Sequence, residues 1–417
     1  MLHRRTALGL IAGTFTASNL KRARAASGDP LKIVALESLS GPGSEQNHLF
    51  SSGVRYGVMK MNEAGGFNGQ PVQFAEYDTG GTTTGAAEKM RTALADGCNV
   101  VLHGSSSATG GQITEDVRKF NLRNPTKRVL FLGTGTEALE LTGEKCQYYF
   151  FRFATNAQIR VRALVSAMKD VGALGTKVFS INQNYAWGKD VEAAVVELAP
   201  ANGYVVVDKI IHDMFKVQDF SPYVARIAAS GADTVFCGNS GNDITYLVKA
   251  IRSAGLKVNF GAAFLDLPGT LAAAGDAAEG YFEAERWNRE AFGDWGVRLW
   301  ADYAARIGSE PSGNEIKSVL AMAFLQQALA TVPQGGAISA DRIAAAMEAT
   351  TYKLPTGDVT MRAADHQALF PIVVARVQKG AKYGADGTDL GFVPVRVIPG
   401  TAAANPVQAA CRMEHPT

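Results

Sequence analysis

Two loops rich in hydroxyl groups carry the most informative chemistry of this sequence. Each loop follows a short apolar run, contains glycine and leads into a helical pattern. Their residues are Gly104, Ser105, Ser106 and Ser107 after 100–103, and Gly133, Thr134, Gly135 and Thr136 after 129–132. In an open α/β sheet, ligands bind outside the carboxyl ends of the strands, where glycine permits close approach and hydroxyls with free helix amides bind anions. The loops predict a small-molecule cleft that takes a carboxylate; the alternative is that the hydroxyls only cap helices.

No set of side chains in the sequence is typical of an enzyme or of a metal site. Asp78-Thr79-Gly80 copies the aspartic-protease triplet, but that chemistry needs a second carboxylate and the triplet occurs once. Neither hydroxyl loop reads Gly-x-Ser-x-Gly, and His-Glu-x-x-His and P-loop motifs are missing. The cysteine spacings fit no zinc motif, and the six histidines do not cluster. We therefore expect a binding protein without catalytic residues, metal or cofactor.

The first 25 residues predict an export signal. Arg4 and Arg5 precede a mostly apolar run, 6–16, which is too short to span a bilayer as a helix. Ala23-Arg24-Ala25 is a small-residue cleavage pattern, so we expect cleavage after Ala25. The arginine pair favours the twin-arginine route, and general secretion is the alternative. Either route places the mature protein outside the cytoplasm.

Export changes how the charge is interpreted. The chain has 41 Lys and Arg against 39 Asp and Glu, but residues 1–25 hold five of the basic residues and no acidic one. The mature protein therefore has a formal charge of −3, which gives no indication of nucleic-acid binding.

The four cysteines of the exported chain permit disulfide formation. Cys98 and Cys237 lie beside or within apolar strand patterns and are expected to be buried free thiols. Cys146 lies in a polar loop and Cys411 in the tail, so a bridge between them would attach the tail to the body of the protein.

Strand and helix patterns alternate along most of the chain, in two series. The expected strands are 31–36, 71–77, 100–103, 129–132, 177–181, 204–211, 234–237 and 258–262, and later helices are expected over 289–307, 314–332 and 340–349. Alternating βαβ units predict mostly parallel sheets with right-handed crossovers. Because roughly 390 mature residues exceed one usual core, the fold class is α/β with two doubly wound, Rossmann-like lobes.

Several short motifs, in order, give the chain a resemblance to a known family. They are Leu39-Ser40-Gly41-Pro42, Asn62-Glu63-Ala64-Gly65-Gly66, Leu141-Thr142-Gly143-Glu144-Lys145-Cys146, Tyr185-Ala186-Trp187-Gly188, Asp219-Phe220-Ser221-Pro222-Tyr223 and Ser230-Gly231-Ala232-Asp233. With these motifs the sequence resembles the type I periplasmic binding proteins of ABC importers, in the branched-chain amino-acid class. The Cys411-Arg412-Met413 tail is similar to the cysteine-containing tail of many such proteins.

The resemblance implies two lobes joined by a hinge of three chain crossings. The crossings are expected near 150–155, 276–284 and 350–356. One lobe would then hold 31–150 plus 280–350, the other 152–278 plus 354–395, and 396–417 would be a C-terminal tail. Closure over a ligand would be a hinge motion.

The resemblance also implies function: a monomeric periplasmic receptor that delivers a small ligand to ABC permease subunits in the membrane. The expected ligand is a branched-chain-like amino acid or another small carboxylate. Aromatic acids, or amide- and urea-like solutes, are the alternatives, as is a sensor for a membrane signalling partner.

The expected ligand-binding residues come from both lobes. The resemblance places Ser106 and Ser107 on the carboxylate loop, and Thr134 and Thr136 on the second loop. In the other lobe, Tyr185 matches a ligand-facing aromatic residue.

Two further residues of that lobe are expected at the ligand. Asn239 ends a strand and so faces the cleft. An α-amino acid needs a partner for its ammonium group, for which Asp266 is the candidate and Glu283 or Glu285 the alternatives. Trp287 is more typical of core or lobe surface, although it could reach the mouth of the cleft.

Overall fold

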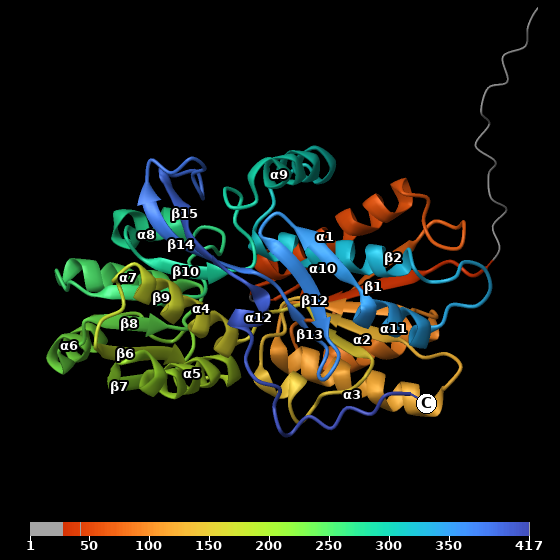
Figure 1. Ribbon diagram of the computed structural model, residues 1–417, viewed down its shortest axis with the longest axis horizontal. Helices are drawn as coiled ribbons and strands as arrows, with labels where there is room; N and C mark the ends of the chain where they lie inside the picture. The colour runs from red at the N-terminus through yellow and green to blue at the C-terminus, as the bar shows by residue number, and fades with distance from the viewer. Residues whose placement is uncertain (1–27, 42, 417) are drawn as a thin grey trace, which may run out of the picture.

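The computed structural model describes residues 28–41 and 43–416, so the expected signal peptide and its cleavage site after Ala25 lie outside the described residues. Two sheets with helices on both faces form two lobes, side by side (Figure 1). This arrangement confirms the predicted α/β architecture. None of the described helices is long and apolar enough to cross a membrane.

The first lobe contains an eight-stranded sheet. Its strand order is β11-β12-β13-β5-β4-β3-β1-β2. The strands are β1 (Lys32–Glu37), β2 (Gln73–Asp78), β3 (Val100–His103), β4 (Leu130–Gly133), β5 (Phe150–Arg152), β11 (Thr351–Leu354), β12 (Gly357–Arg362) and β13 (Gln367–Leu369). The helices are α1 (Ser44–Glu63), α2 (Thr83–Ala95), α3 (Ser107–Arg123), α9 (Gly293–Ile307), α10 (Gly313–Leu329) and α11 (Ala340–Ala349), with the 3₁₀ turn η1 (Leu139–Thr142). α1 packs on α10 and α2 on α3, one pair on each face.

The second lobe contains a seven-stranded sheet in the order β15-β14-β10-β9-β8-β6-β7. Its strands are β6 (Lys177–Gln183), β7 (Val205–His212), β8 (Thr234–Cys237), β9 (Asn259–Ala262), β10 (Phe282–Glu285), β14 (Ile372–Lys379) and β15 (Leu390–Ile398). Its helices are α4 (Ala157–Asp170), α5 (Ala186–Asn202), α6 (Ser221–Ser230), α7 (Asn242–Ser253) and α8 (Thr270–Ala274), with the 3₁₀ turn η2 (Gly275–Ala278). The pairs β6–β7, β6–β8, β8–β9 and β9–β10 are parallel, as the alternating pattern predicts.

The strand pairing corrects two of the expected hinge positions. β10 pairs with β9 and β14, so the chain leaves the second lobe after Glu285 rather than near 276–284. β11 and β12 form a hairpin, and β13 continues from β12 to β5 of the first sheet. Residues 354–369 therefore belong to the first lobe, and the third crossing lies between Leu369 and Ile372 rather than near 350–356.

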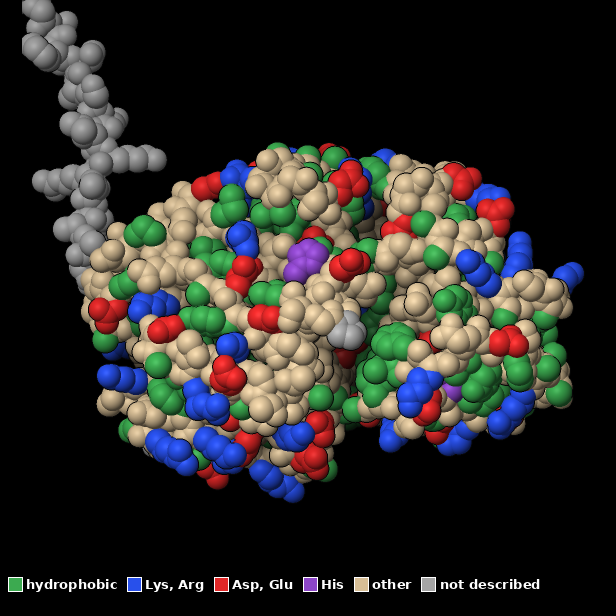
Figure 2. Space-filling model, turned by 180° about the vertical axis from the view of Figure 1, so that it is seen from behind, with side chains coloured by type: hydrophobic (Ala, Val, Ile, Leu, Met, Phe, Trp, Pro, Cys, Tyr) green, Lys and Arg blue, Asp and Glu red, His purple; other side chains and the backbone are tan. Residues whose placement is uncertain are grey.

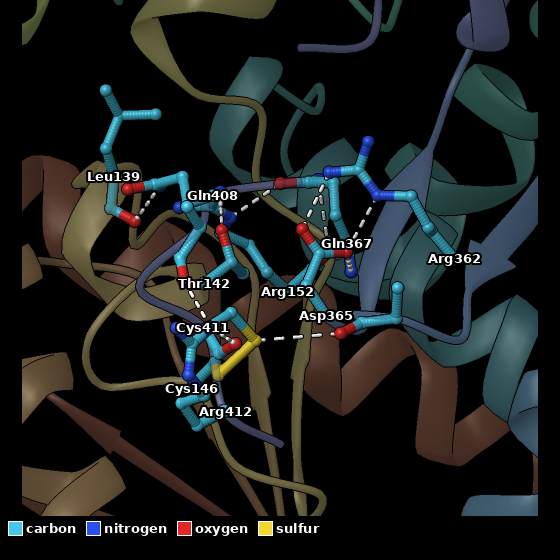
Figure 3. Close-up of a disulfide and its surroundings, with 12 residues drawn as sticks. Leu139, Thr142, Cys146, Arg152, Arg362, Asp365, Gln367, Gln408, Cys411 and Arg412 are labelled. Carbon is cyan, nitrogen blue, oxygen red and sulfur yellow. Dashed lines mark hydrogen bonds and ion pairs between the residues drawn. A yellow bond between two sulfur atoms is a disulfide. The ribbon is translucent and has the colours of Figure 1, made fainter. Parts of the chain in front are cut away.

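A disulfide between Cys146 and Cys411 ties the C-terminal segment to the first lobe, with 5.4 Å between the Cα atoms (Figure 3). Residues 396–398 complete β15, so the tail begins later than expected and first forms the short helix α12 (Gly400–Ala403). The amide of Gln408 then donates to the Leu139 carbonyl at 2.6 Å. The predicted bridge is confirmed, and so are the buried free thiols Cys98 and Cys237.

Candidate functional site

The first hydroxyl loop joins β3 to α3, and its serines are held by the chain itself. Ser106 is the N-cap of α3, since its Oγ accepts from the Thr109 amide at 3.4 Å. Ser107 Oγ accepts from the amides of Glu137 and Ala138, both at 3.0 Å. Ser106 and Ser107 remain partly exposed. Ser106 therefore caps α3, as the alternative interpretation of this loop expected.

The amides that precede this helix are occupied by a carboxyl group of the same lobe. Glu37, at the end of β1, accepts from the Gly104 amide at 2.7 Å, from the Ser105 amide at 3.1 Å, and from the Ser105 hydroxyl. Burial raises the pKa of Glu37 to about 8 despite these hydrogen bonds. The amides of Gly104 and Ser105, which precede the helix, are therefore already occupied within the first lobe.

The glycines of the two loops make room for a side chain rather than for a ligand. A Cβ on Gly104 would lie 2.2 Å from the Phe50 ring, and one on Gly135 would lie 2.6 Å from it. Phe50 comes from α1 and is 5% exposed. A ligand was expected here because glycine lets another group approach the backbone closely. In the structure, the group that does so is the Phe50 ring of the first lobe.

The second hydroxyl loop is also internal to the first lobe. Thr134 and Thr136 are fully buried. Thr134 Oγ1 donates to the His103 carbonyl at 3.4 Å and accepts from the Ser318 hydroxyl of α10 at the same distance. Thr136 Oγ1 has no hydrogen-bond partner in the described part of the chain.

The predicted residues of the second lobe lie at the ends of β6 and β8. Tyr185 directly precedes α5 and is partly exposed, and burial of its hydroxyl, followed by the nearby Glu137, raises its pKa. Asn239 is fully buried, with its Oδ1 facing His212 Nε2 at 3.1 Å. Its Nδ2 has no partner among the described residues.

A cavity of about 650 Å³ lies between the lobes, in a size range typical of small-molecule sites. Figure 2 shows the furrow between the two halves of the molecule. The lining includes Asp266, Glu283, Glu285, Trp287, Arg289, Trp300, Glu315, Val373, Tyr383 and Phe392. Asp266, both of its alternatives and Trp287 thus meet at one cavity. Ser106, Ser107, Thr134, Thr136, Tyr185 and Asn239 are not among the lining residues.

Two carboxyl groups meet on the inner wall of this cavity. The Asp266 amide donates to Glu283 Oε1 at 3.2 Å, and the two carboxyl groups are within hydrogen-bonding contact. Burial raises the pKa of Asp266, and burial followed by the charge of Asp266 raises that of Glu283 well above its usual value. Asp266 Oδ1 and Glu283 Oε2 are buried without a hydrogen-bond partner in the described chain.

A glycine permits this pair to touch the other lobe. A Cβ on Gly313 would lie 2.4 Å from Asp266 Oδ2. Gly313 is the first residue of α10, whose N-cap Ser312 forms a capping box with Glu315. The Asp266 carboxyl therefore reaches the N-terminus of a first-lobe helix, where the helix dipole favours negative charge.

A buried ionic cluster lies beside the carboxyl pair and also joins the lobes. Arg160 of α4 contacts Glu137 at 2.9 Å and Glu285 at 2.7 Å, and Lys317 of α10 contacts Glu285 at 3.1 Å. Burial disfavours the charge on Arg160, but Glu137 and Glu285 outweigh it and raise the Arg160 pKa. Arg160 and Lys317 likewise outweigh burial and lower the Glu285 pKa. Glu285 thus forms ion pairs with these cations, whereas Asp266 and Glu283 form none within 4 Å in the described residues and feel the cations only through longer-range attraction.

Sequence reasoning missed Glu37, Phe50, Arg289 and Trp300. Glu37 carried a usable signal, because it ends an apolar strand and the strand-end rule applies to it as well. The others carried none, since an aromatic residue or an arginine in a helix or connection is common. No group of three or more potential metal ligands occurs in residues 28–41 and 43–416.

Comparisons with known proteins agree with this architecture. Residues 30–382 match the family model described as periplasmic binding protein. A protein of Brucella melitensis named "Leu/Ile/Val-binding protein homolog 4" is 48% identical over 96% of each chain. The solved closed structure of a Leu-, Ile-, Val-, Thr- and Ala-binding protein from Brucella ovis is 48% identical, has a TM-score of 0.91, and covers 93% of this chain and 100% of its own. A Leu-, Ile-, Val-, Thr- and Ala-binding protein of Pseudomonas aeruginosa is 23% identical, over 79% of this chain and 85% of its own.

Proposed function

The chain belongs to the periplasmic binding protein family, and we propose that it binds an amino acid in the cavity between its lobes. The family consists of solute receptors rather than enzymes, and its members deliver small ligands to ABC permeases from the periplasm. The receptor role therefore follows from family membership. The proposal concerns the ligand, a monomeric state and export with cleavage after Ala25.

The proposal of an amino-acid ligand rests on the carboxyl pair Asp266–Glu283. Three buried cations, Arg160, Arg286 and Lys317, face four buried carboxyl groups, Glu137, Asp266, Glu283 and Glu285. Of these four carboxyl groups, Asp266 and Glu283 form no ion pair within 4 Å in the described residues. A buried charge is costly without a partner, so an empty site holds a proton there and an occupied site holds a ligand cation.

The names of the relatives support an amino acid in particular. The Brucella ovis and Pseudomonas aeruginosa proteins are named for binding leucine, isoleucine, valine, threonine and alanine. An α-amino acid supplies the ammonium group that the carboxyl pair lacks. Ser106 and Tyr185 are partly exposed and remain proposed ligand contacts, although neither is among the lining residues of this cavity.

Binding measurements on the mature receptor test this proposal. A thermal-shift screen should find an α-amino acid that raises the melting temperature, because a ligand of the folded state stabilises it. Calorimetry with this amino acid and with its deaminated acid then compares wild type with Asp266→Asn. The variant should lose several kcal/mol of amino-acid affinity, since it leaves the ammonium unpaired, and should bind the deaminated acid as well as or better than wild type.

Glu310→Gln is the matched control, because Glu310 is an exposed acid at the rim of the same cavity. Its amino-acid affinity should stay near that of wild type. The proposal fails if wild type prefers a plain carboxylic acid and Asp266→Asn leaves this preference unchanged; a plain or aromatic acid then becomes the ligand.

A further inference from the structure

The chain crosses between the lobes a fourth time, after β15. Ile398, the last residue of β15, pairs with Ile372 at the start of β14, so the chain leaves the second sheet beside the third hinge crossing. It then reaches the first lobe, where Cys411 is bonded to Cys146 (Figure 3). We call residues 399–411 the C-terminal strap. Unlike the three hinge crossings, the strap is attached to its second lobe by a disulfide rather than by a strand.

The start of the strap packs directly on the hinge. α12, which lies between the two lobes in Figure 1, contacts α4 of the second lobe and β12 of the first. A Cβ on Gly400 would lie 2.4 Å from the Leu369 carbonyl oxygen and 2.9 Å from the carbonyl carbon of Phe370. Glycine is needed for this close approach to the third crossing. Any rotation of the chain at this crossing therefore displaces the strap as well.

One residue of the strap, Asn405, is bonded to both lobes. Its Oδ1 accepts from Asn156 Nδ2 at 2.8 Å, and Asn156 is the N-cap of α4 in the second lobe. Its backbone carbonyl accepts from Arg362 Nη1 of β12, in the first lobe, at 2.6 Å. Asn405 and Asn156 are both buried. A rotation that separates α4 from β12 breaks one of these bonds, and a buried polar group without its partner is costly.

The disulfide keeps the strap next to these contacts. Beyond Asn405, the Gln408 amide and the bridge of Cys411 attach the strap to the first lobe. A chain end that is not tied down frays from the body of a protein. A segment fixed at both ends instead stays at a high effective concentration and returns to its contacts after each opening.

We propose that the C-terminal strap restrains the opening of the two lobes. Asn405 is the contact that resists rotation, and the Cys146–Cys411 bridge holds the strap in place. The lobes then open over a smaller range than the three hinge crossings alone allow. The restraint acts on the hinge of the ligand-free protein, so it does not depend on which ligand the cavity binds.

Hydrogen–deuterium exchange and small-angle X-ray scattering of the ligand-free protein test this proposal. The variants are Asn405→Ala, which keeps the bridge, and the double change Cys146→Ser with Cys411→Ser, which removes it. Cys98→Ala is the matched control, because it changes a free thiol of the first lobe. All proteins are measured at a temperature at which each of them is folded.

The amides of the hinge segments 152–157 and 366–372 should exchange about tenfold faster in both variants, as expected for the loss of a buried hydrogen bond. The amides of β3 and β8 should stay protected over the same period, because the lobes remain folded. The double cysteine variant should also have a larger mean radius of gyration than wild type. Cys98→Ala should match wild type in both measurements.

Three results would overturn the proposal. The strap restrains nothing if hinge exchange and radius of gyration in the double cysteine variant equal those of wild type. Global unfolding is the cause if β3 and β8 lose protection together with the hinge segments. The bridge has no part in the restraint if only Asn405→Ala speeds hinge exchange. A screen in which no amino acid binds would instead contradict the proposed function and leave the restraint in place.

Discussion

Glu37 Oε1 accepts a hydrogen bond from the Gly104 amide at 2.7 Å, so a carboxyl group of the protein occupies a backbone amide beside the loop at which a ligand carboxylate is expected. The two residues are 67 positions apart in the sequence; Glu37 ends β1, and Gly104 directly follows the neighbouring parallel strand β3. Glu37 thus supplies the hydrogen-bond acceptor for the amides of this loop from within the first lobe. This contact also buries a carboxyl whose pKa rises to about 8.

The first prediction concerns the pH dependence of stability. Below about pH 4.5 Glu37 is protonated in both folded and unfolded protein. Between pH 4.5 and 8 the unfolded chain ionises while the folded protein keeps its proton, so stability is lost as pH rises through this window, by about 5 kcal/mol in total. Glu37→Gln should remove this loss and unfold later than wild type in urea at pH 8.5.

At pH 4.5 the difference between Glu37→Gln and wild type should be much smaller, because both side chains are then neutral. Glu310→Gln, which changes an exposed acid, should follow the wild-type pH profile. Parallel pH profiles for Glu37→Gln and wild type would show that Glu37 ionises normally.

The second prediction concerns the buried ionic cluster. Arg160 donates to Glu137, Glu285 and the carbonyl oxygens of Ala263 and Ala284. Arg160→Met should cost roughly 3–5 kcal/mol of unfolding free energy, because it leaves buried carboxylates and carbonyls without their donor. Arg226→Met, which breaks an exposed ion pair with Asp208, should leave denaturant unfolding nearly unchanged. If Arg160→Met lowers the unfolding free energy no more than this control does, the buried cluster does not stabilise the fold as proposed.

The third prediction concerns the disulfide. Reduction, or the double change Cys146→Ser with Cys411→Ser, should lower the unfolding free energy by about 2–5 kcal/mol, since the bridge closes a loop with a sequence separation of 265. The double variant should no longer respond to reductant. Cys98→Ala, at a free thiol, should retain the full response. Equal melting of wild type with and without reductant would show that the bridge does not stabilise the fold.

The fourth prediction links ligand binding to proton release. Burial raises the pKa of both Asp266 and Glu283, so we expect this pair to bind a proton more readily than exposed carboxyl groups do. A bound ammonium group favours the ionised pair, so amino-acid affinity should rise with pH until the pair is ionised without ligand. Calorimetry in two buffers of different ionisation heat should show proton release in wild type and none in Asp266→Asn. A binding heat that is independent of the buffer would contradict a shared proton.

The sequence by itself determined the kind of fold and the elements of each lobe. The predicted strand 234–237 and helix 340–349 match β8 and α11 residue for residue. Such elements depend on the local periodicity of apolar residues and on capping residues, both of which can be recognised from neighbouring positions in the sequence. The Cys146–Cys411 bridge was also predictable, because an exported chain left two cysteines outside its strand patterns.

Only the tertiary structure decided which groups meet across long distances in the chain. The three strands β11–β13, residues 351–369, pair with the first sheet rather than the second, which strand patterns cannot specify because either edge offers the same hydrogen bonds. The sequence likewise could not show that Glu37, rather than a ligand, meets the Gly104 amide. Asp266 was predicted from its place after β9, but its pairing with Glu283 and the stacking of Arg289 on Trp300 and Tyr383 depend on packing between the two lobes.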